Sequence, residues 1–150
     1  MAKTPSAKKR LLVIVTILGV GACICIASKR VQSLLMLGYV DSAIGRVRTV
    51  VAAEDEFARL HPEVGFTCML SELPRDEQIG RLVKDGTDNG YAFTLAGCRA
   101  IEPGKPISKY YITARPLHSR LPAFCSDQSG ILKSDASGSI EKCVQDGAQL

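Results

Sequence analysis

The feature that most constrains the fold is an unbroken apolar run near the N-terminus. Residues 11–27 (LLVIVTILGVGACICIA) carry no charge, and basic residues lie on both sides of the run. At a rise of 1.5 Å per residue, a helix of this length covers about 25 Å, which is the short end of a membrane span. The pattern predicts a basic cytoplasmic N-terminus over residues 1–10 and a transmembrane helix over residues 11–28, with the lipid bilayer as a partner.

Three interpretations of this run remain open. A single-pass anchor needs no further signal, whereas a cleaved signal peptide would also show a basic start and an apolar core. The third interpretation is lipidation, because residues 20–23 (VGAC) place small residues before Cys23, as in a lipobox. Residues 24–27 stay apolar, where a mature lipoprotein normally begins with a polar tether. We therefore favour the anchor and keep Cys23 as a candidate lipidation site.

The next segment, residues 29–61, is predicted to form an amphipathic helix that continues the membrane segment. Its apolar residues recur at helical spacing and fall largely on one face. They are Val40, Ala43, Ile44, Val47, Val50, Val51, Phe57 and Leu60. The acidic run at residues 54–56 is assigned to the solvated face by default, and the alternative is that one of its carboxylates caps a neighbouring backbone amide or faces the sheet. His61 ends the helix, because the following Pro62 disfavours the helical conformation.

The remaining residues, 62–150, are predicted to form one small head domain. A short helix is expected within residues 73–83, and the alternation from Tyr91 to Ala96 predicts a strand. Further strands are expected over residues 109–117, 123–126 and 130–133, and the tail is polar and glycine-rich. The predicted fold class is therefore α+β: a long N-terminal helix, half transmembrane and half amphipathic, packed on an antiparallel sheet of three to four strands.

Four cysteines lie in the predicted head: Cys68, Cys98, Cys125 and Cys143. Four cysteines in so small a domain, behind an export-type N-terminus, indicate two disulfides and an oxidising compartment, with free buried thiols as the alternative. Sequence alone allows three connectivities. We predict the pairs Cys68–Cys98 and Cys125–Cys143, because each brackets one local unit. The expected location is the inner membrane, crossed once, with the C-terminal domain periplasmic or extracellular.

Charge argues against nucleic acid as a partner. Residues 1–30 hold six of the nineteen Lys and Arg and no acid, so the other 120 residues carry thirteen bases against fifteen acids. A net charge of −2 on that part of the chain is not the basic surface that nucleic acid requires.

The sequence shows no catalytic, metal-binding or cofactor-binding constellation, so a non-enzymatic protein without a cofactor is expected. His61 and His118 belong to no ligand-spaced cluster. Ser126, Asp127 and Ser129 stand beside Gly130, and such residues are typical of a tight turn rather than a catalytic group. Tyr110 and Tyr111 are candidates to line a binding surface, but they lie on alternating faces of a predicted strand, so one of them is expected in the core.

Four segments carry a resemblance to a known family. They are residues 43–50 (AIGRVRTV), 62–68 (PEVGFTC), 90–95 (GYAFTL) and 124–130 (FCSDQSG). In this order, and behind a split apolar–amphipathic segment, they resemble small bacterial pilin-like proteins of the type IV pilin and type II secretion pseudopilin superfamily. The resemblance spans about residues 43–143. It implies a structural role, as a minor pilin or pseudopilin that packs against other pilin-like subunits through its N-terminal helix.

The N-terminus departs from the family pattern. Prepilins carry a glycine before the cleavage point and a glutamate within the apolar helix. Here Arg10 leads directly into Leu11, and the first acidic residue is Asp41. The usual prepilin cleavage motif is therefore missing. This departure leaves an alternative function, a stand-alone binding module at the cell surface or in the periplasm, held by a membrane anchor or by a lipid on Cys23.

Overall fold

The computed structural model describes residues 36–74 and 77–150. The predicted membrane segment at residues 11–28 and the candidate lipidation site Cys23 lie outside this part of the chain. Within it, no helix combines the length and the apolar composition that crossing a membrane requires. Residues 38–150 form one structural unit, and the account below concerns that unit.

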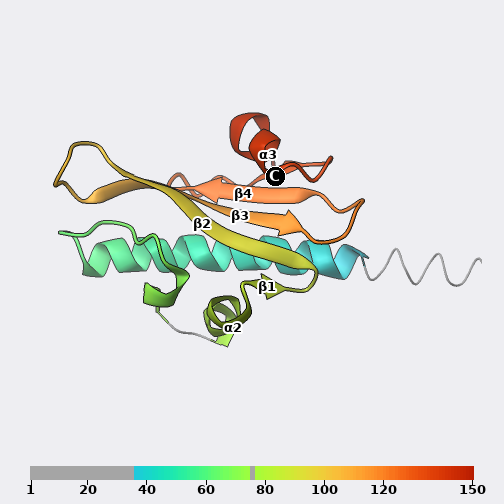
Figure 1. Ribbon diagram of the computed structural model, residues 1–150, viewed down its shortest axis with the longest axis horizontal. Helices are drawn as coiled ribbons and strands as arrows, with labels where there is room; N and C mark the ends of the chain where they lie inside the picture. The colour runs from blue at the N-terminus through green and yellow to red at the C-terminus, as the bar shows by residue number, and fades with distance from the viewer. Residues whose placement is uncertain (1–35, 75–76) are drawn as a thin grey trace, which may run out of the picture. The chain divides into compact units, whose positions relative to one another are not determined.

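Residues 36–60 form a helix (Figure 1), and one row of its side chains is buried. The buried positions are Ala43, Val47, Val50 and Glu54. Their spacing of four, three and four residues places them in one row along the helix, as the apolar periodicity predicts. The amide of His61 donates the last helical hydrogen bond to the carbonyl of Phe57, at 2.9 Å, just before Pro62.

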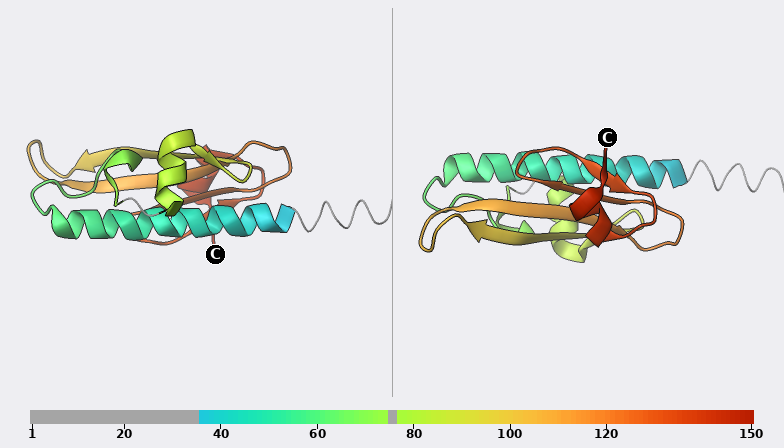
Figure 2. Two further views of the ribbon diagram at one scale, coloured as in Figure 1. Left: turned by 90° about the horizontal axis from the view of Figure 1, so that it is seen from below. Right: turned by 90° about the horizontal axis from the view of Figure 1, so that it is seen from above.

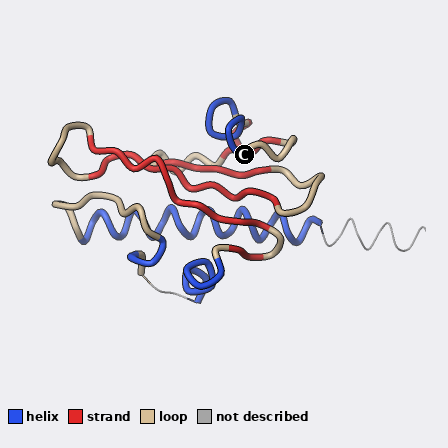
Figure 3. The backbone as a smooth tube through the Cα atoms, in the orientation of Figure 1, coloured by secondary structure: helices blue, strands red, loops and turns tan. Residues whose placement is uncertain are grey.

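Six antiparallel strands form the sheet, in the order β1-β2-β3-β4-β5-β6 (Figure 3). Their bounds are Thr87–Asp88 (β1), Tyr91–Ala100 (β2), Ile107–Pro116 (β3), Ala123–Asp127 (β4), Lys133–Asp135 (β5) and Ala148–Gln149 (β6). Every strand pairs with the next one along the chain, so the sheet is a simple meander. The two edge strands have two residues each, and β1 pairs only with Tyr91 and Ala92 of the ten-residue strand β2.

The predicted fold class is wrong in its sheet and in its helices. The sheet has six strands rather than three to four, and the described residues form three α-helices: residues 36–60, α2 (Glu77–Asp85) and α3 (Ile140–Asp146). A 3-10 helix, η1 (Leu70–Glu72), precedes α2. A single helix running from a transmembrane half into residues 36–60 is not part of the described structure.

The strands and the helix that the sequence patterns did not predict are short. β1, β5 and β6 have two or three residues each, too few to show alternation, and the predicted fourth strand at residues 130–133 is shifted to β5. The predicted helix at residues 73–83 begins later, as α2. The seven-residue helix α3 was missed in the polar tail, although Ser139 caps it by accepting a hydrogen bond from the amide of Lys142.

The sheet carries helices on both faces. Helix 36–60 and α2 share a core with Tyr91, Phe93, Tyr110, Ile112 and Phe124 of the sheet. On the opposite face, Cys143 and its neighbours in α3 pack on Ala123 and Cys125. Successive strand residues point to opposite faces, which is why Phe124 and Cys125 belong to different clusters. Figure 2 shows α2 in front when the unit is seen from below and α3 in front when it is seen from above.

Two disulfides join parts of the unit that are distant in sequence. They are Cys68–Cys98 and Cys125–Cys143, the pairs expected from the sequence, with Cα atoms 5.9 and 6.1 Å apart. The first fastens the segment after helix 36–60 to β2, and the second fastens α3 to β4. The segment after the helix is also held by hydrogen bonds between Val64, Phe66 and Ile107 of β3.

Candidate functional site

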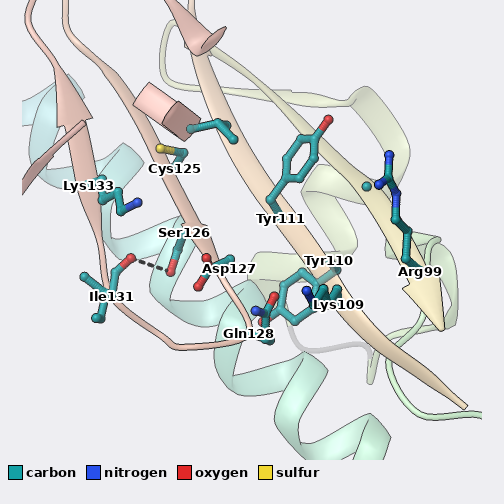
Figure 4. Close-up of a pocket in the computed structure, with 12 residues that line it drawn as sticks. Arg99, Lys109, Tyr110, Tyr111, Cys125, Ser126, Asp127, Gln128, Ile131 and Lys133 are labelled. Atoms are coloured by element: carbon teal, nitrogen blue, oxygen red, sulfur yellow. Dashed lines mark hydrogen bonds between the residues drawn. The ribbon is translucent and has the colours of Figure 1, made fainter. Parts of the chain in front are cut away.

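A hollow of about 400 Å³ lies on the α3 side of the sheet (Figure 4). We call it the outer groove. Its lining includes Gly97, Arg99, Lys109, Tyr111, Asp127 and Lys133. Cys125 and Val144 also line it, and both belong to the small cluster around α3. The groove therefore lies on the face of the sheet that helix 36–60 does not cover.

The strand register brings the polar residues of the groove together. Arg99 on β2 lies opposite Lys109 on β3, and Tyr111 on β3 lies opposite Asp127 on β4. Lys133 on β5 lies opposite Cys125. Because directly paired residues of antiparallel strands point to the same face, the pairing places three basic side chains, one acid and one aromatic ring in a single groove.

The position of the Tyr111 ring depends on a glycine on the neighbouring strand. The β2–β3 register shifts between Ala96 and Arg99, and Gly97 there has a φ of 68°. A Cβ atom at Gly97 would overlap the Tyr111 ring. Two features therefore require glycine at position 97: the positive φ of the backbone and the close approach of the Tyr111 ring. Its neighbour in sequence, Tyr110, lies on the opposite face and is buried in the core, so Tyr110 is the one of the two tyrosines that was expected there.

The turn after β4 closes one end of the groove. Asp127 Oδ1 accepts hydrogen bonds from the amide and the hydroxyl of Ser129, at 2.9 and 2.6 Å. The hydroxyl of Ser126 donates to the carbonyl of Ile131 at 3.0 Å (Figure 4). The amide of Gly130 donates to the carbonyl of Asp127 at 2.9 Å. These are the contacts of a tight turn.

The two histidines lie apart from the groove. His61 is exposed at the end of helix 36–60, with its ring centroid 4.6 Å from that of Phe57. His118 is exposed beside Gly90. In the part of the chain that the structure describes, no group of three or more His, Cys, Asp or Glu side chains is placed to hold a metal ion.

A buried carboxylate on the other face of the sheet corrects the expectation for the acidic run. Glu54 is 0% exposed instead of facing solvent. Its Oε2 accepts a hydrogen bond from the amide of Thr67 at 2.9 Å, while its Oε1 and the hydroxyl of Tyr110 have no hydrogen-bond partner among the described residues. Burial raises the pKa of Glu54 to about 7, against the lowering effect of the Thr67 amide.

This shift predicts a stability that falls as pH rises. The folded state holds the Glu54 proton more tightly than the unfolded chain, so the contribution of Glu54 is complete below pH 4.5 and is lost as pH rises through 7. We expect Glu54→Gln, which keeps an acceptor for Thr67, to remove this dependence and to raise the free energy of unfolding at pH 8 by on the order of 2 kcal/mol. Urea denaturation between pH 4.5 and 8 checks this, and equal slopes for both proteins would contradict it.

Sequence patterns indicated some of these residues and missed others. Tyr111 was considered as a binding-surface residue. Arg99 and Lys133 were not, because their place in the groove depends on a bulge and on a three-residue strand. The spacing of Lys109 and Tyr111 was an available signal, since residues two apart on a strand share a face. Glu54 was detectable by its place four residues after Val50 on the buried helix row.

Comparison with known proteins gave no match: no family model, no curated protein and no solved structure matches this chain. The resemblance to pilin-like proteins stays a prediction.

Proposed function

We propose that the protein is a membrane-anchored structural or assembly component of a type IV pilus or type II secretion-like system. In this proposal residues 11–28 span the inner membrane, and residues 38–150 lie in the periplasm or outside the cell. The observation that carries it is the combination of helix 36–60, which follows the apolar run in sequence, with a sheet braced by two disulfides. Disulfides persist in oxidising compartments, which supports the outward placement.

The free face of helix 36–60 supports the assembly role. Between residues 39 and 59, its exposed positions are Asp41, Gly45, Arg48, Ala52, Asp55 and Arg59. Small residues at positions 45 and 52 permit close approach of another helix. Along the same face the charges alternate in sign from Asp41 to Arg48 to Asp55. A staggered neighbouring helix with the same pattern would therefore meet opposite charges, which favours association in a defined register.

Crosslinking in membranes tests this proposal. A photo-crosslinking amino acid at Ala52, in the full chain in its own membrane, is expected to capture a second copy or another subunit. Arg48→Glu makes all three alternating charges negative and is expected to reduce the crosslink at least about fivefold, whereas Lys84→Glu on α2 leaves it unchanged. Recovery of the chain only as an isolated monomer would overturn the proposal.

A second candidate function is a stand-alone binding module, anchored in the membrane or lipidated at Cys23. The VGAC sequence at residues 20–23 and the outer groove favour it. Palmitate labelling that disappears in Cys23→Ser would support the lipidated form. A mature N-terminus at Met1 or Ala2, measured by mass spectrometry, would exclude it.

A further inference from the structure

The outer groove holds a repulsive pair of basic residues. Arg99 and Lys109 are exposed and directly opposite each other on adjacent strands. Like charges in that position destabilise a sheet. None of the ion pairs within residues 36–74 and 77–150 involves Arg99, Lys109 or Lys133. The groove therefore presents three cations whose charge the described residues leave uncompensated.

The single acidic side chain in the groove does little to offset them. One carboxylate oxygen of Asp127 already accepts two hydrogen bonds from Ser129. Residues 31–150 as a whole carry a net charge of −2, so the positive charge is concentrated locally against an acidic background. An anionic group bound between Arg99 and Lys109 would relieve their mutual repulsion and gain charge-assisted hydrogen bonds.

The groove also offers apolar contacts. Tyr111 and half-buried Val144 line it, and so does Ile131, which has 43% of its surface exposed. A volume of about 400 Å³ accommodates a few side chains rather than a folded domain. The best-fitting ligand is therefore short and carries both carboxylates and an apolar side chain.

We propose that the outer groove binds a short acidic peptide segment of a partner protein, with Arg99, Lys109 and Lys133 holding its carboxylates and Tyr111 contacting an apolar side chain. A nucleic acid fits less well, because a long polyanion would extend beyond the three cations on a part of the chain that carries a net negative charge. The groove lies on the face of the sheet away from helix 36–60. An experiment that contradicts this inference therefore does not contradict the proposed function, and the reverse also holds.

A peptide-binding measurement tests the inference. The probe is a fluorescein-labelled Glu-Glu-Phe-Glu-Glu peptide, titrated at low salt with the full chain in a neutral detergent, and read by fluorescence anisotropy. We expect binding that Lys109→Gln combined with Lys133→Gln weakens at least about tenfold. The matched control, Lys84→Gln with Lys105→Gln, changes the net charge equally at positions that do not line the groove and is expected to weaken binding less than twofold.

Two further arms identify the ligand and its location. A Gln-Gln-Phe-Gln-Gln peptide is expected to bind at least tenfold more weakly than the acidic probe. In the wild-type chain, the acidic probe is expected to shift the amide NMR signals of Arg99, Lys109 and Lys133, a readout that needs no variant. Four outcomes would each overturn the inference. The acidic probe does not bind, or both double variants weaken its binding equally. Alternatively, the glutamine peptide binds as tightly as the acidic probe, or a five-nucleotide oligo-dT binds more tightly.

Discussion

Replacing Val47 with aspartate is expected to abolish the folded state of residues 38–150. Val47 is 0% exposed and lies at the centre of the buried row of helix 36–60. The substitution loses about 2 kcal/mol of apolar burial and places an unpaired carboxylate in the core, which costs several kcal/mol more. The total approaches the whole stability of a typical domain. Circular dichroism and amide NMR dispersion of the full chain in detergent measure the loss.

The control places the same charge on the other side of the same helix. Ala52 is exposed, so Ala52→Asp removes no buried contact, and it is expected to change the free energy of unfolding by no more than about 1 kcal/mol. A cooperative, wild-type-like unfolding transition in Val47→Asp would show that this face of the helix does not form the core.

Removing the Cys125–Cys143 disulfide is expected to release α3 from the sheet. The bond closes a chain separation of 18 residues, which corresponds to about 3 kcal/mol of loop-closure free energy. A seven-residue helix is too short to persist in water without such an attachment. We therefore expect Cys125→Ala with Cys143→Ala to lower the free energy of unfolding by about 3 kcal/mol, measured by urea denaturation, and to abolish hydrogen-exchange protection in α3.

The other disulfide supplies the matched control. Cys68→Ala with Cys98→Ala also removes one bond, but it frees the segment after helix 36–60 and leaves α3 attached. Exchange protection in α3 should therefore survive in this variant while the overall stability falls. Protection of α3 that is equal in the two double variants would show that the packing of Ile140 and Val144 against Ala123 holds this helix without the bond.

Periodic elements of this fold were predictable from the sequence. The alternation of Tyr91 and Phe93 with smaller residues predicted β2, and the opposite faces of Tyr110 and Tyr111 followed from their adjacency. The helical spacing of Ala43, Val47 and Val50 predicted the buried face of helix 36–60. In each case one surface of a regular element faces the core, so burial imposes the period of the element on the sequence.

The remaining features depend on tertiary pairing. Strands of two or three residues, such as β5, form because a neighbouring strand is already in place, and they leave no period in the sequence. The groove needs the bulge at Gly97 and the register that sets Arg99 opposite Lys109, neither of which has a local signature. The acidic run was assigned to solvent only by default, beside the alternative of one carboxylate capping an amide or facing the sheet. The burial of Glu54 follows from its place on the helix row and from the hydrogen bond of the Thr67 amide.

The meander has a consequence for how the chain reaches its native state. Each strand pairs with its immediate neighbour in sequence, so β2 and β3 need only the short loop between Ala100 and Ile107 to meet. Contacts between sequence neighbours cost little loop-closure entropy, and proteins rich in them fold quickly. The strands can therefore pair in chain order. Helix 36–60 makes the contacts that are most distant in sequence, so its docking on the sheet becomes the step that sets the folding rate.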